Sequence, residues 1–326
     1  MAAPTNSLSK WLRNAAALRP DATFARQGSS ALDRRWMTVE ELDARADRHA
    51  AHWTRAQLGE GARIAMLAPA DPETIAAIAG ATRAGLEVWL APPGIEAQEL
   101  ADGAREAGAL ALSAPVEFAG LNYAQRLGEA AVLTPLAVRR ALWGGERHGA
   151  IRLDAVVAIA PGHERLGGEG TLALLGQART LTLEASMLQA AAGDFARAAR
   201  LQPGGTVLSL VSLASVGGLV CGAIAPLMSG AEVLWQSPFS ALGFTKALAE
   251  RAPAHLIAPS GIVADLGRAG VLTPERVASL TLVATGDFDP MFDHDLEPDQ
   301  VLILEAEPWG ATRLTRLSQA FGEDPD

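Results

Sequence analysis

The chain of 326 residues is 49% hydrophobic and 20% charged, which predicts a soluble globular protein with one large domain or two smaller ones. Its formal net charge of −10 argues against binding to nucleic acids or anionic membranes, because both need a basic surface. The sequence has no unbroken apolar run long enough to span a membrane, and its N-terminus lacks the apolar core of a signal peptide. We therefore expect no membrane contact and a cytoplasmic location.

Helix and strand patterns alternate along the first half of the chain. Residues 38–57 predict a helix that begins with a capping box formed by Thr38 and Glu41. Residues 71–85 predict a second helix, with Asp71 as its N-cap and a proline at the first helical position. Further elements expected in this half are strands over 63–69, 86–92 and 109–114, a helix over 94–108 and an arginine-rich helix over 134–149.

The second half repeats this alternation, and we place a boundary at residue 150, which gives domains 1–150 and 151–326. Strands are expected over 153–160, 204–212, 231–236, 254–260, 279–285 and 300–308, and helices over 182–201, 216–230, 240–253 and 261–270. Strands and helices that alternate in this way predict an α/β fold of two similar layered αβα subdomains with mostly parallel sheets.

A glycine-rich stretch at residues 161–181 follows the predicted strand 153–160. Glycines let backbone N–H groups approach an anion closely, so a glycine-rich loop after a strand is a candidate phosphate site. The candidate residues in this stretch are Gly167, Gly168, Gly170 and Thr171.

The order of these segments resembles the large N-terminal domain of the adenylate-forming enzymes, which include acyl-CoA synthetases, luciferases and the adenylation domains of peptide synthetases. "TVEELDARADRHAAHW" is similar to the family's "TYAELDARADRLAAAL", and "LGEGARIAMLAPADPE" is similar to its "LGPGDRVAILLPNSPE". "ARTLTLEASML" and "ASLTLVATGDFDP" continue the similarity, which extends from about Trp11 to about Leu314. The resemblance implies the layered fold of that domain.

The phosphate-loop position departs from the family pattern. In those enzymes a loop with the sequence Thr-Ser-Gly-Ser-Thr-Gly-x-Pro-Lys binds the ATP phosphates, and residues 161–181 occupy its place. This segment keeps glycines and the hydroxyl of Thr171 but has no lysine. Arg165 or Arg179 could supply positive charge, whereas Glu164 and Glu169 place negative charge where a triphosphate would lie.

The nucleotide motif Gly-Tyr-Gly-x-Thr-Glu matches residues 308–313. By resemblance, Trp309 and Gly310 would contact the adenine and Thr312 would contact a phosphate. Arg313 replaces the glutamate that binds magnesium in the family, so we expect no metal site.

The family's aromatic–histidine pair, which lines the acyl pocket, matches "SLASVGGL" at residues 212–219. Alanine and Ser215 replace the two larger side chains. The resemblance implies either a wider acyl pocket that includes Ser215, Gly217 and Gly218, or simple packing at these positions.

The family continues with a β-barrel subdomain and a C-terminal lid that carries a catalytic lysine, and we expect this chain to lack both. Its two lysines, Lys10 and Lys246, match neither the lid lysine nor the phosphate-loop lysine.

Three other groups of residues suggest different chemistry. His49 and His52 have metal-ligand spacing on one helix, but no third ligand is evident, so we favour packing. The acidic stretch 287–295 is either a cation site or a solvated loop, and the loop is the simpler interpretation. Cys221 lies in an apolar run and is expected to be a buried structural thiol.

The missing lysines and metal-binding carboxylate are charges that stabilise phosphoryl transfer. We therefore predict a catalytically degraded acyl-CoA synthetase-like protein that acts as a binding or scaffold subunit in acyl or secondary metabolism. The expected partner is a ligase, an acyl-carrier protein or a second copy of the chain. No cofactor is expected to be required, and ATP, AMP or acyl-CoA are candidate residual ligands. One alternative is an acid–thiol ligase or acyl-transfer enzyme that another chain completes, and another is a new activity, such as hydrolysis, that uses the acidic stretch.

Overall fold

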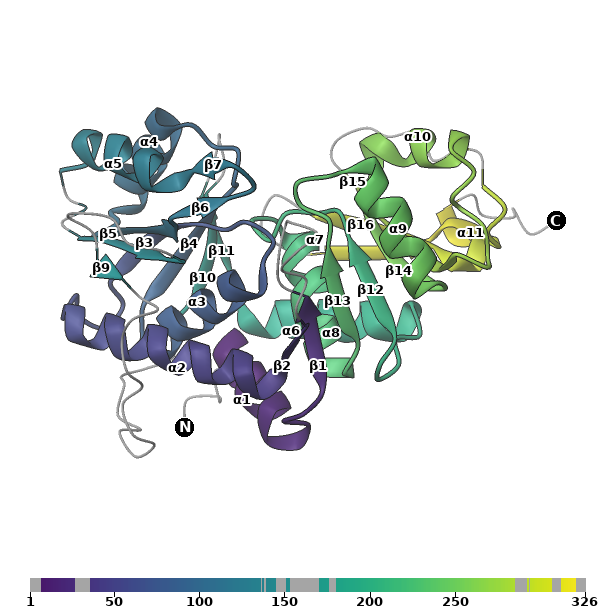
Figure 1. Ribbon diagram of the computed structural model, residues 1–326, viewed down its shortest axis with the longest axis horizontal. Helices are drawn as coiled ribbons and strands as arrows, with labels where there is room; N and C mark the ends of the chain where they lie inside the picture. The colour runs from purple at the N-terminus through teal and green to yellow at the C-terminus, as the bar shows by residue number, and fades with distance from the viewer. Residues whose placement is uncertain are drawn as a thin grey trace.

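The computed structural model describes residues 7–26, 36–135, 137, 139–144, 151–152, 170–175, 180–284, 292, 294–306 and 312–320. In these ranges the chain forms two large sheets with helices between them and further helices on both outer faces (Figure 1). This layered α/β arrangement with mostly parallel strands confirms the predicted fold class.

The first sheet has seven described strands in the order β11-β10-β4-β3-β5-β8-β9. All neighbours in it are parallel except β10 and β11. Its strands are β3 (Arg63–Leu67), β4 (Glu87–Ala91), β5 (Ala111–Pro115), β8 (Arg139–Trp143), β9 (Ile151–Arg152), β10 (Leu172–Leu175) and β11 (Thr180–Leu183). A short antiparallel pair, β6 (Glu117–Phe118) and β7 (Leu121–Asn122), follows β5.

The second sheet has eight described strands in the order β17-β16-β15-β14-β12-β13-β1-β2. Only the edge pairs β16–β17 and β1–β2 are antiparallel. Its strands are β1 (Thr23–Arg26), β2 (Trp36–Thr38), β12 (Thr206–Ser209), β13 (Glu232–Trp235), β14 (Ala254–Pro259), β15 (Val277–Ala284), β16 (Val301–Ala306) and β17 (Thr312–Arg316).

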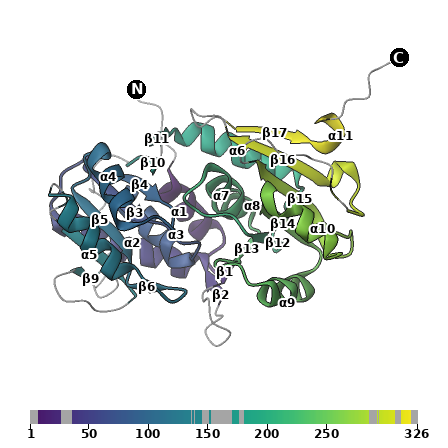
Figure 2. The same ribbon diagram turned by 90° about the horizontal axis from the view of Figure 1, so that it is seen from above.

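Helices cover both faces of each sheet, as the view from above also shows (Figure 2). The helices on the shared inner side are α1 (Leu8–Leu18), α2 (Val39–Ala56), α3 (Pro72–Arg83), α6 (Ala185–Ala198), α7 (Val216–Leu219), the π-helix η1 (Val220–Ile224) and α8 (Ala225–Ser229). The outer helices are α4 (Ala97–Ala107) and α5 (Tyr123–Leu133) on the first sheet, and α9 (Ala241–Arg251), α10 (Val263–Arg268) and α11 (Leu317–Ala320) on the second. The 3-10 helices η2 (Ser260–Ile262) and η3 (Pro298–Gln300) complete the described elements.

The capping signals in the sequence predict the starts of α2 and α3 correctly. Thr38 and Glu41 form a reciprocal capping box, in which each side chain accepts the other residue's backbone N–H at 3.1 Å. Asp71 caps α3 by accepting the backbone N–H of Glu73 at 2.8 Å. Both caps satisfy N–H groups that have no partner within their own helix.

The arginine-rich helix predicted over 134–149 is wrong. The described part of this segment contains β8, which pairs in parallel with β5. Ala141, Leu142 and Trp143 are all buried, and an interior strand of a sheet covered on both faces lacks the polar–apolar alternation that marks an exposed strand. The strand predicted over 153–160 lies outside the described residues.

The strands of each sheet come from both sides of residue 150. β10 and β11 join the first sheet, while β1 and β2 join the second. The boundary predicted at residue 150 therefore does not coincide with the division of strands between the sheets.

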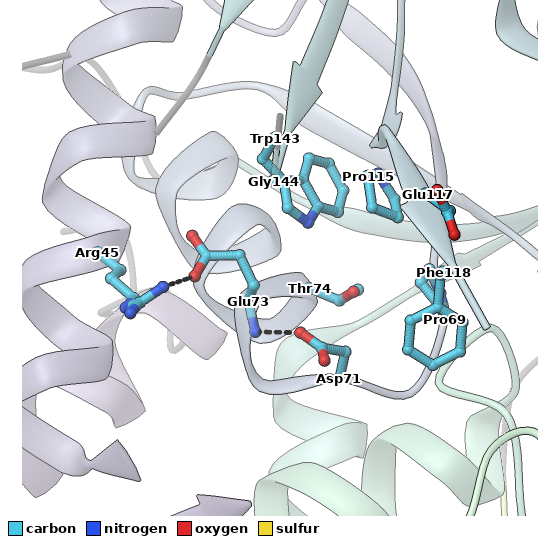
Figure 3. A pocket seen from close by; sticks show the side chains of 10 residues that line it. All are labelled: Arg45, Pro69, Asp71, Glu73, Thr74, Pro115, Glu117, Phe118, Trp143 and Gly144. Carbon is cyan, nitrogen blue, oxygen red and sulfur yellow. Dashed lines mark hydrogen bonds and ion pairs between the residues drawn. The ribbon is translucent and has the colours of Figure 1, made fainter. Parts of the chain in front are cut away.

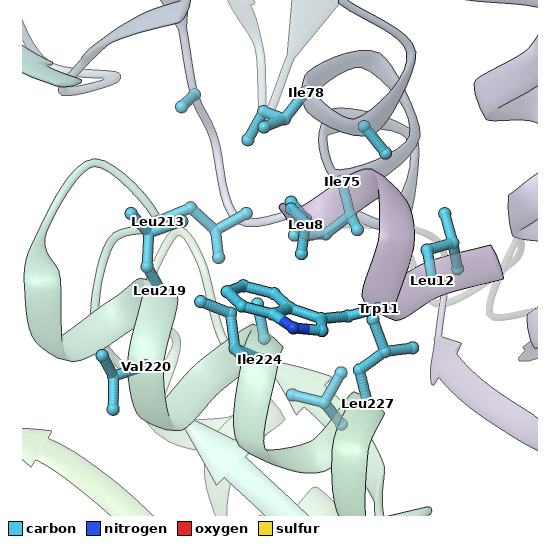
Figure 4. Close-up of a cluster of buried hydrophobic side chains, with 14 of the residues drawn as sticks. Leu8, Trp11, Leu12, Ile75, Ile78, Leu213, Leu219, Val220, Ile224 and Leu227 are labelled. Carbon is cyan, nitrogen blue, oxygen red and sulfur yellow. The ribbon is translucent and has the colours of Figure 1, made fainter. Parts of the chain in front are cut away.

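The inner helices enclose one apolar core that receives side chains from both sheets. Ile64 and Val88 of the first sheet belong to it, and so do Val207 and Val233 of the second. Trp11 of α1 lies in this core and is only 6% exposed. Figure 4 shows its ring among apolar side chains of α3, α7, η1 and α8.

Gly80 sets the closest approach of α2 and α3. A Cβ atom at this position would lie 2.4 Å from the Cβ of His49 and 2.6 Å from the carbonyl oxygen of Ala46. We expect Gly80→Ala to destabilise the fold by about 2–3 kcal/mol, because the helices must move apart. Gly94→Ala is the matched control, since no atom lies within 4 Å of its added Cβ, and its effect should stay within about 0.5 kcal/mol. Urea unfolding measures both variants, and equal stabilities would contradict this account of the packing.

Candidate functional site

The first sheet has a topological switch point between β3 and β5. From β3 the chain enters α3 on the inner face of the sheet, whereas β5 leads through β6 and β7 to α5 on the outer face (Figure 1). In open α/β sheets, a crevice for ligands forms where adjacent strands send their connections to opposite faces.

A cavity of about 270 Å³ lies at this switch point. Its lining comes from the connections that leave β3, β5 and β8, from the first turn of α3, and from one residue of α2 (Figure 3). The residues that line it are Arg45, Pro69, Asp71, Glu73, Thr74, Pro115, Glu117, Phe118, Trp143 and Gly144.

Glu73 is a buried carboxylate with two basic partners. Arg45 donates a hydrogen bond to one carboxylate oxygen, and His49 Nε2 lies 2.9 Å from the other. Burial opposes ionisation of Glu73, but the hydrogen bonds and charges of His49 and Arg45 outweigh it and hold its pKa below the ordinary value. Glu73 is therefore ionised at neutral pH and its charge is compensated.

Asp71 is compensated only in part, because burial raises its pKa more than the charge of Arg45 lowers it. Burial raises its pKa from 3.8 to about 6, although its hydrogen bond from the Glu73 backbone N–H favours the ionised form. The nearby negative charge of Glu73 raises the pKa further. An ionised Asp71 is consequently costly for the folded protein on its own.

Thr74 has an unsatisfied hydroxyl at the same place. Its side chain is fully buried, and its Oγ1 has no hydrogen-bond partner among the described residues. Figure 3 shows this hydroxyl beside Asp71 and pointing toward Phe118. Buried polar groups are nearly always satisfied in folded proteins, so an exception at a cavity is informative.

The residues predicted to form a phosphate loop lie elsewhere. Gly170 and Thr171 precede β10, where Gly170 N–H donates to the carbonyl of Thr82 and Val88 N–H donates to the carbonyl of Thr171. A Cβ atom on Gly170 would lie 1.8 Å from the carbonyl oxygen of Leu86. Close backbone packing therefore explains this glycine, while Gly167 and Gly168 lie outside the described residues.

The predicted acyl-pocket residues lie at the carboxyl edge of the second sheet. Ser215 caps α7: its hydroxyl accepts the N–H of Gly218 at 3.0 Å and donates to the carbonyl of Ser212 at 2.7 Å. A Cβ on Gly217 would meet Val283 at 2.8 Å. These contacts give all three predicted residues a packing role.

Thr312 lies at the same edge of the second sheet, opposite Ala306 at the carboxyl end of β16. The structure thus gathers Thr312, Ser215 and Gly217 at the edge of one sheet, whereas Gly170 and Thr171 lie in the other sheet. Trp309 and Gly310 lie outside the described residues.

The other candidate residues named from the sequence are the two histidines, the cysteine and the acidic stretch. His49 binds Glu73, and burial, His49 and Arg55 lower the pKa of His52 to about 4. Cys221 is fully buried, as predicted, and burial raises the pKa of its thiol. The acidic stretch 287–295 falls largely outside the described residues.

Within the described ranges, no three histidine, cysteine or acidic side chains are grouped so that they could hold a metal ion. None of the described helices combines the length and apolarity needed to cross a bilayer.

The cavity itself was missed in the sequence. In sequence, Asp71 and the residues after it predict only the start of a helix. The detectable signal was the position of three polar residues, Asp71, Glu73 and Thr74, directly after the buried strand 63–67, because polar residues that follow a parallel strand lie at its functional edge.

Comparison with known proteins agrees with this fold. Residues 12–142 match the family described as AMP-binding enzyme. The apo structure of MbtA from Mycobacterium smegmatis matches with a TM-score of 0.73 at 18% identity, over 96% of this chain and 59% of that chain. No curated protein matches the sequence significantly.

These matches confirm the resemblance drawn from the sequence. The chain has the α/β fold of the MbtA structure, and its residues 12–142 match the AMP-binding family. It spans less than two thirds of the length of the MbtA chain.

Gly170 and Thr171 provide a direct test of packing against ligand binding. We expect Gly170→Ala to cost about 3 kcal/mol of stability, because the new Cβ meets backbone that cannot rotate away. Thr171 is exposed, so Thr171→Ala should change stability by less than about 0.5 kcal/mol. Thermal and urea unfolding of both variants measure the difference, and a tolerated alanine at position 170 would refute the packing role.

The raised pKa of Asp71 predicts a pH-dependent cost. Its carboxyl group is neutral in the folded protein below about pH 6 but ionises near pH 4 when unfolded. Relative to Asp71→Asn, the wild-type protein should therefore lose stability as pH rises from about 4 to about 6 and change little above that. Asparagine keeps the helix cap, and Glu106→Gln, an exposed change on α4, is the control. Urea unfolding from pH 4 to 7 tests this, and a constant difference would contradict it.

Proposed function

We propose that the protein is a non-catalytic member of the adenylate-forming superfamily that serves as a binding or scaffold subunit in acyl or secondary metabolism. Its partner would be an acyl-activating ligase, an acyl-carrier protein or a second copy of the chain. The proposal concerns the nucleotide and acyl positions at the carboxyl edge of the second sheet, where the family resemblance locates the chemistry.

Arg313 carries the proposal. It lies on β17 directly opposite Glu305 of β16, and both side chains are exposed. The family pattern has a magnesium-binding glutamate at this position, whereas a guanidinium repels the cation. Opposite charges that face each other across an antiparallel pair stabilise the sheet modestly, so Arg313 has a structural use that does not involve nucleotide.

Two further features support the same interpretation. The chain has no lysine near the expected phosphate loop, since Lys10 and Lys246 lie far from it in sequence. Ser215, which replaces the pocket histidine, uses its hydroxyl both to cap α7 and to bond a backbone carbonyl.

The alternative is an adenylate-forming or acyl-transfer enzyme that a second chain completes. Thr312 favours it, because this residue keeps the family type and lies at the carboxyl end of β16. Under this alternative, the partner would supply the missing lysine and the metal ligand.

Pyrophosphate exchange with Mg-ATP and a panel of carboxylic acids tests the proposal. We expect no exchange by the isolated chain and no rise in melting temperature with Mg-ATP, because a ligand stabilises a protein only when the folded state binds it. Exchange that depends on a carboxylic acid would overturn the proposal. Affinity capture should recover a ligase, a carrier protein or the chain itself, and exchange restored by a captured chain would favour the alternative.

Arg313 can be tested separately in the same assays. Arg313→Glu should introduce a melting-temperature shift that needs both Mg²⁺ and ATP, because it adds a carboxylate where the family binds the metal. Arg313→Gln removes the charge without adding that ligand and should show no such shift. Equal behaviour of the two variants would remove Arg313 as support for the proposal.

A further inference from the structure

The cavity at the switch point of the first sheet is separate from the nucleotide and acyl positions, which lie at the edge of the second sheet. Its lining contains three carboxylates, Asp71, Glu73 and Glu117, but only one guanidinium, that of Arg45. Arg45 pairs with Glu73. The cavity therefore carries a formal excess of two negative charges when its acids are ionised.

This charge excludes an anionic ligand, even though the cavity contains a helix N-terminus. The positive end of the α3 dipole favours anions in general. Here Asp71 already accepts the N–H of Glu73, and Glu73 adds a second carboxylate in the first turn. A phosphate or carboxylate would meet these charges at close range.

The hydrogen-bonding groups of the cavity are mainly acceptors. Asp71 and Glu117 are acceptors when ionised, and no cation among the described residues forms a salt bridge with either. The Thr74 hydroxyl is buried and without a partner in the described part of the chain. A ligand that donates several hydrogen bonds would satisfy Thr74 and compensate Asp71 together.

The remaining walls are apolar and aromatic. Phe118 and Trp143 face the cavity together with Pro69 and Pro115 (Figure 3). Aromatic faces attract cations, and proline rings accept an apolar body. The ring of His49 contacts the ring of Trp143 edge-on, with 5.9 Å between the two ring centroids.

Size and composition limit the ligand further. A volume of about 270 Å³ is just below the range of about 300–1,000 Å³ that is typical for ligand pockets, so the cavity suits a small ligand. The described residues contain no grouping of three acidic or histidine ligands that could hold a metal ion.

We propose that this cavity binds a small organic cation, in which a primary ammonium group bonds Asp71 and Thr74 and an apolar body lies against Phe118 and Trp143. Glu117, at the exposed rim, attracts the cation from solvent. Arg45 keeps Glu73 neutralised, so that Asp71 remains the charge available to the ligand. The site is independent of the proposed loss of adenylation.

Calorimetric titration of the full chain with n-butylammonium chloride at constant ionic strength tests this proposal. We expect saturable binding. Asp71→Asn keeps the helix cap but removes the charge, and it should weaken binding at least about tenfold, since a charged hydrogen bond is worth about 1.5–3 kcal/mol. Thr74→Val, which keeps the shape of the side chain, should weaken binding about threefold or more.

Two further variants and two other probes complete the design. Glu117→Gln changes an exposed side chain and should weaken binding moderately without affecting the fold, whereas Glu106→Gln, at the C-terminal end of α4 and thus at the opposite edge of the sheet, should leave it unchanged. Neutral n-butanol and tetramethylammonium, which has no N–H group, should bind at least about tenfold more weakly than n-butylammonium. Thermal unfolding confirms that each variant is folded.

The proposal fails if n-butylammonium does not bind saturably, or if Asp71→Asn and Thr74→Val bind it as the wild type does. Equal binding of n-butanol or tetramethylammonium would also overturn it, because the acceptors would then play no part. Binding of Mg²⁺ that Asp71→Asn abolishes, without binding of n-butylammonium, would assign the cavity to a metal instead. None of these measurements involves ATP, so the outcome is separate from that of the exchange assay.

Discussion

The burial of Trp11 between the two halves of the molecule is the contact on which the arrangement of the sheets depends. α1 packs against α2 and α3 on the side of the first sheet and against α8 on the side of the second. Its tryptophan fills the space between Ile75 and Ile224 (Figure 4). Without this side chain, the inner faces of both helix layers would leave apolar surface open to water, at a cost proportional to the exposed area.

The backbone also links the two sheets, because each sheet contains strands from both halves of the sequence. The chain leaves α1, adds β1 and β2 to the edge of the second sheet, and only then builds the first sheet. It later returns β10 and β11 to the first sheet before it completes the second. Because each sheet contains strands from both halves of the sequence, the two sheets cannot be separated at one point of the chain. The carboxyl edges of the sheets are therefore held in a fixed relation by both side chains and backbone.

The sequence predicts the layered fold because its helix caps and apolar strands act locally. Asp71 and Pro72 fix the start of α3, and the structure agrees. α1 was not predicted, although Leu8, Leu12 and Ala15 show the spacing of a helical apolar face. The predictions that failed concern features set by contacts between residues distant in sequence. One is the apolar run that forms the interior strand β8. The other is the role of Gly170, which packs against backbone and was expected to bind a ligand. Gly170 looks like an anion-binding glycine in sequence, but Leu86, which comes from another element, determines its role.

The candidate site residues at the two sheet edges differ in whether their hydroxyl groups have hydrogen-bond partners. At the edge of the second sheet, the Ser215 hydroxyl makes two internal hydrogen bonds, and Gly217 closes against Val283. At the edge of the first sheet, the Thr74 hydroxyl has no partner among the described residues, and desolvation of the half-buried Asp71 disfavours its ionised form. An unsatisfied buried hydroxyl beside a cavity is a place where a bound ligand can supply the missing hydrogen-bond partner. Thr281 and Trp235 of the second sheet also have buried polar atoms without a partner in the described part of the chain, but Thr74 lines a cavity beside Asp71. Binding by this protein is therefore to be sought at that edge of the first sheet.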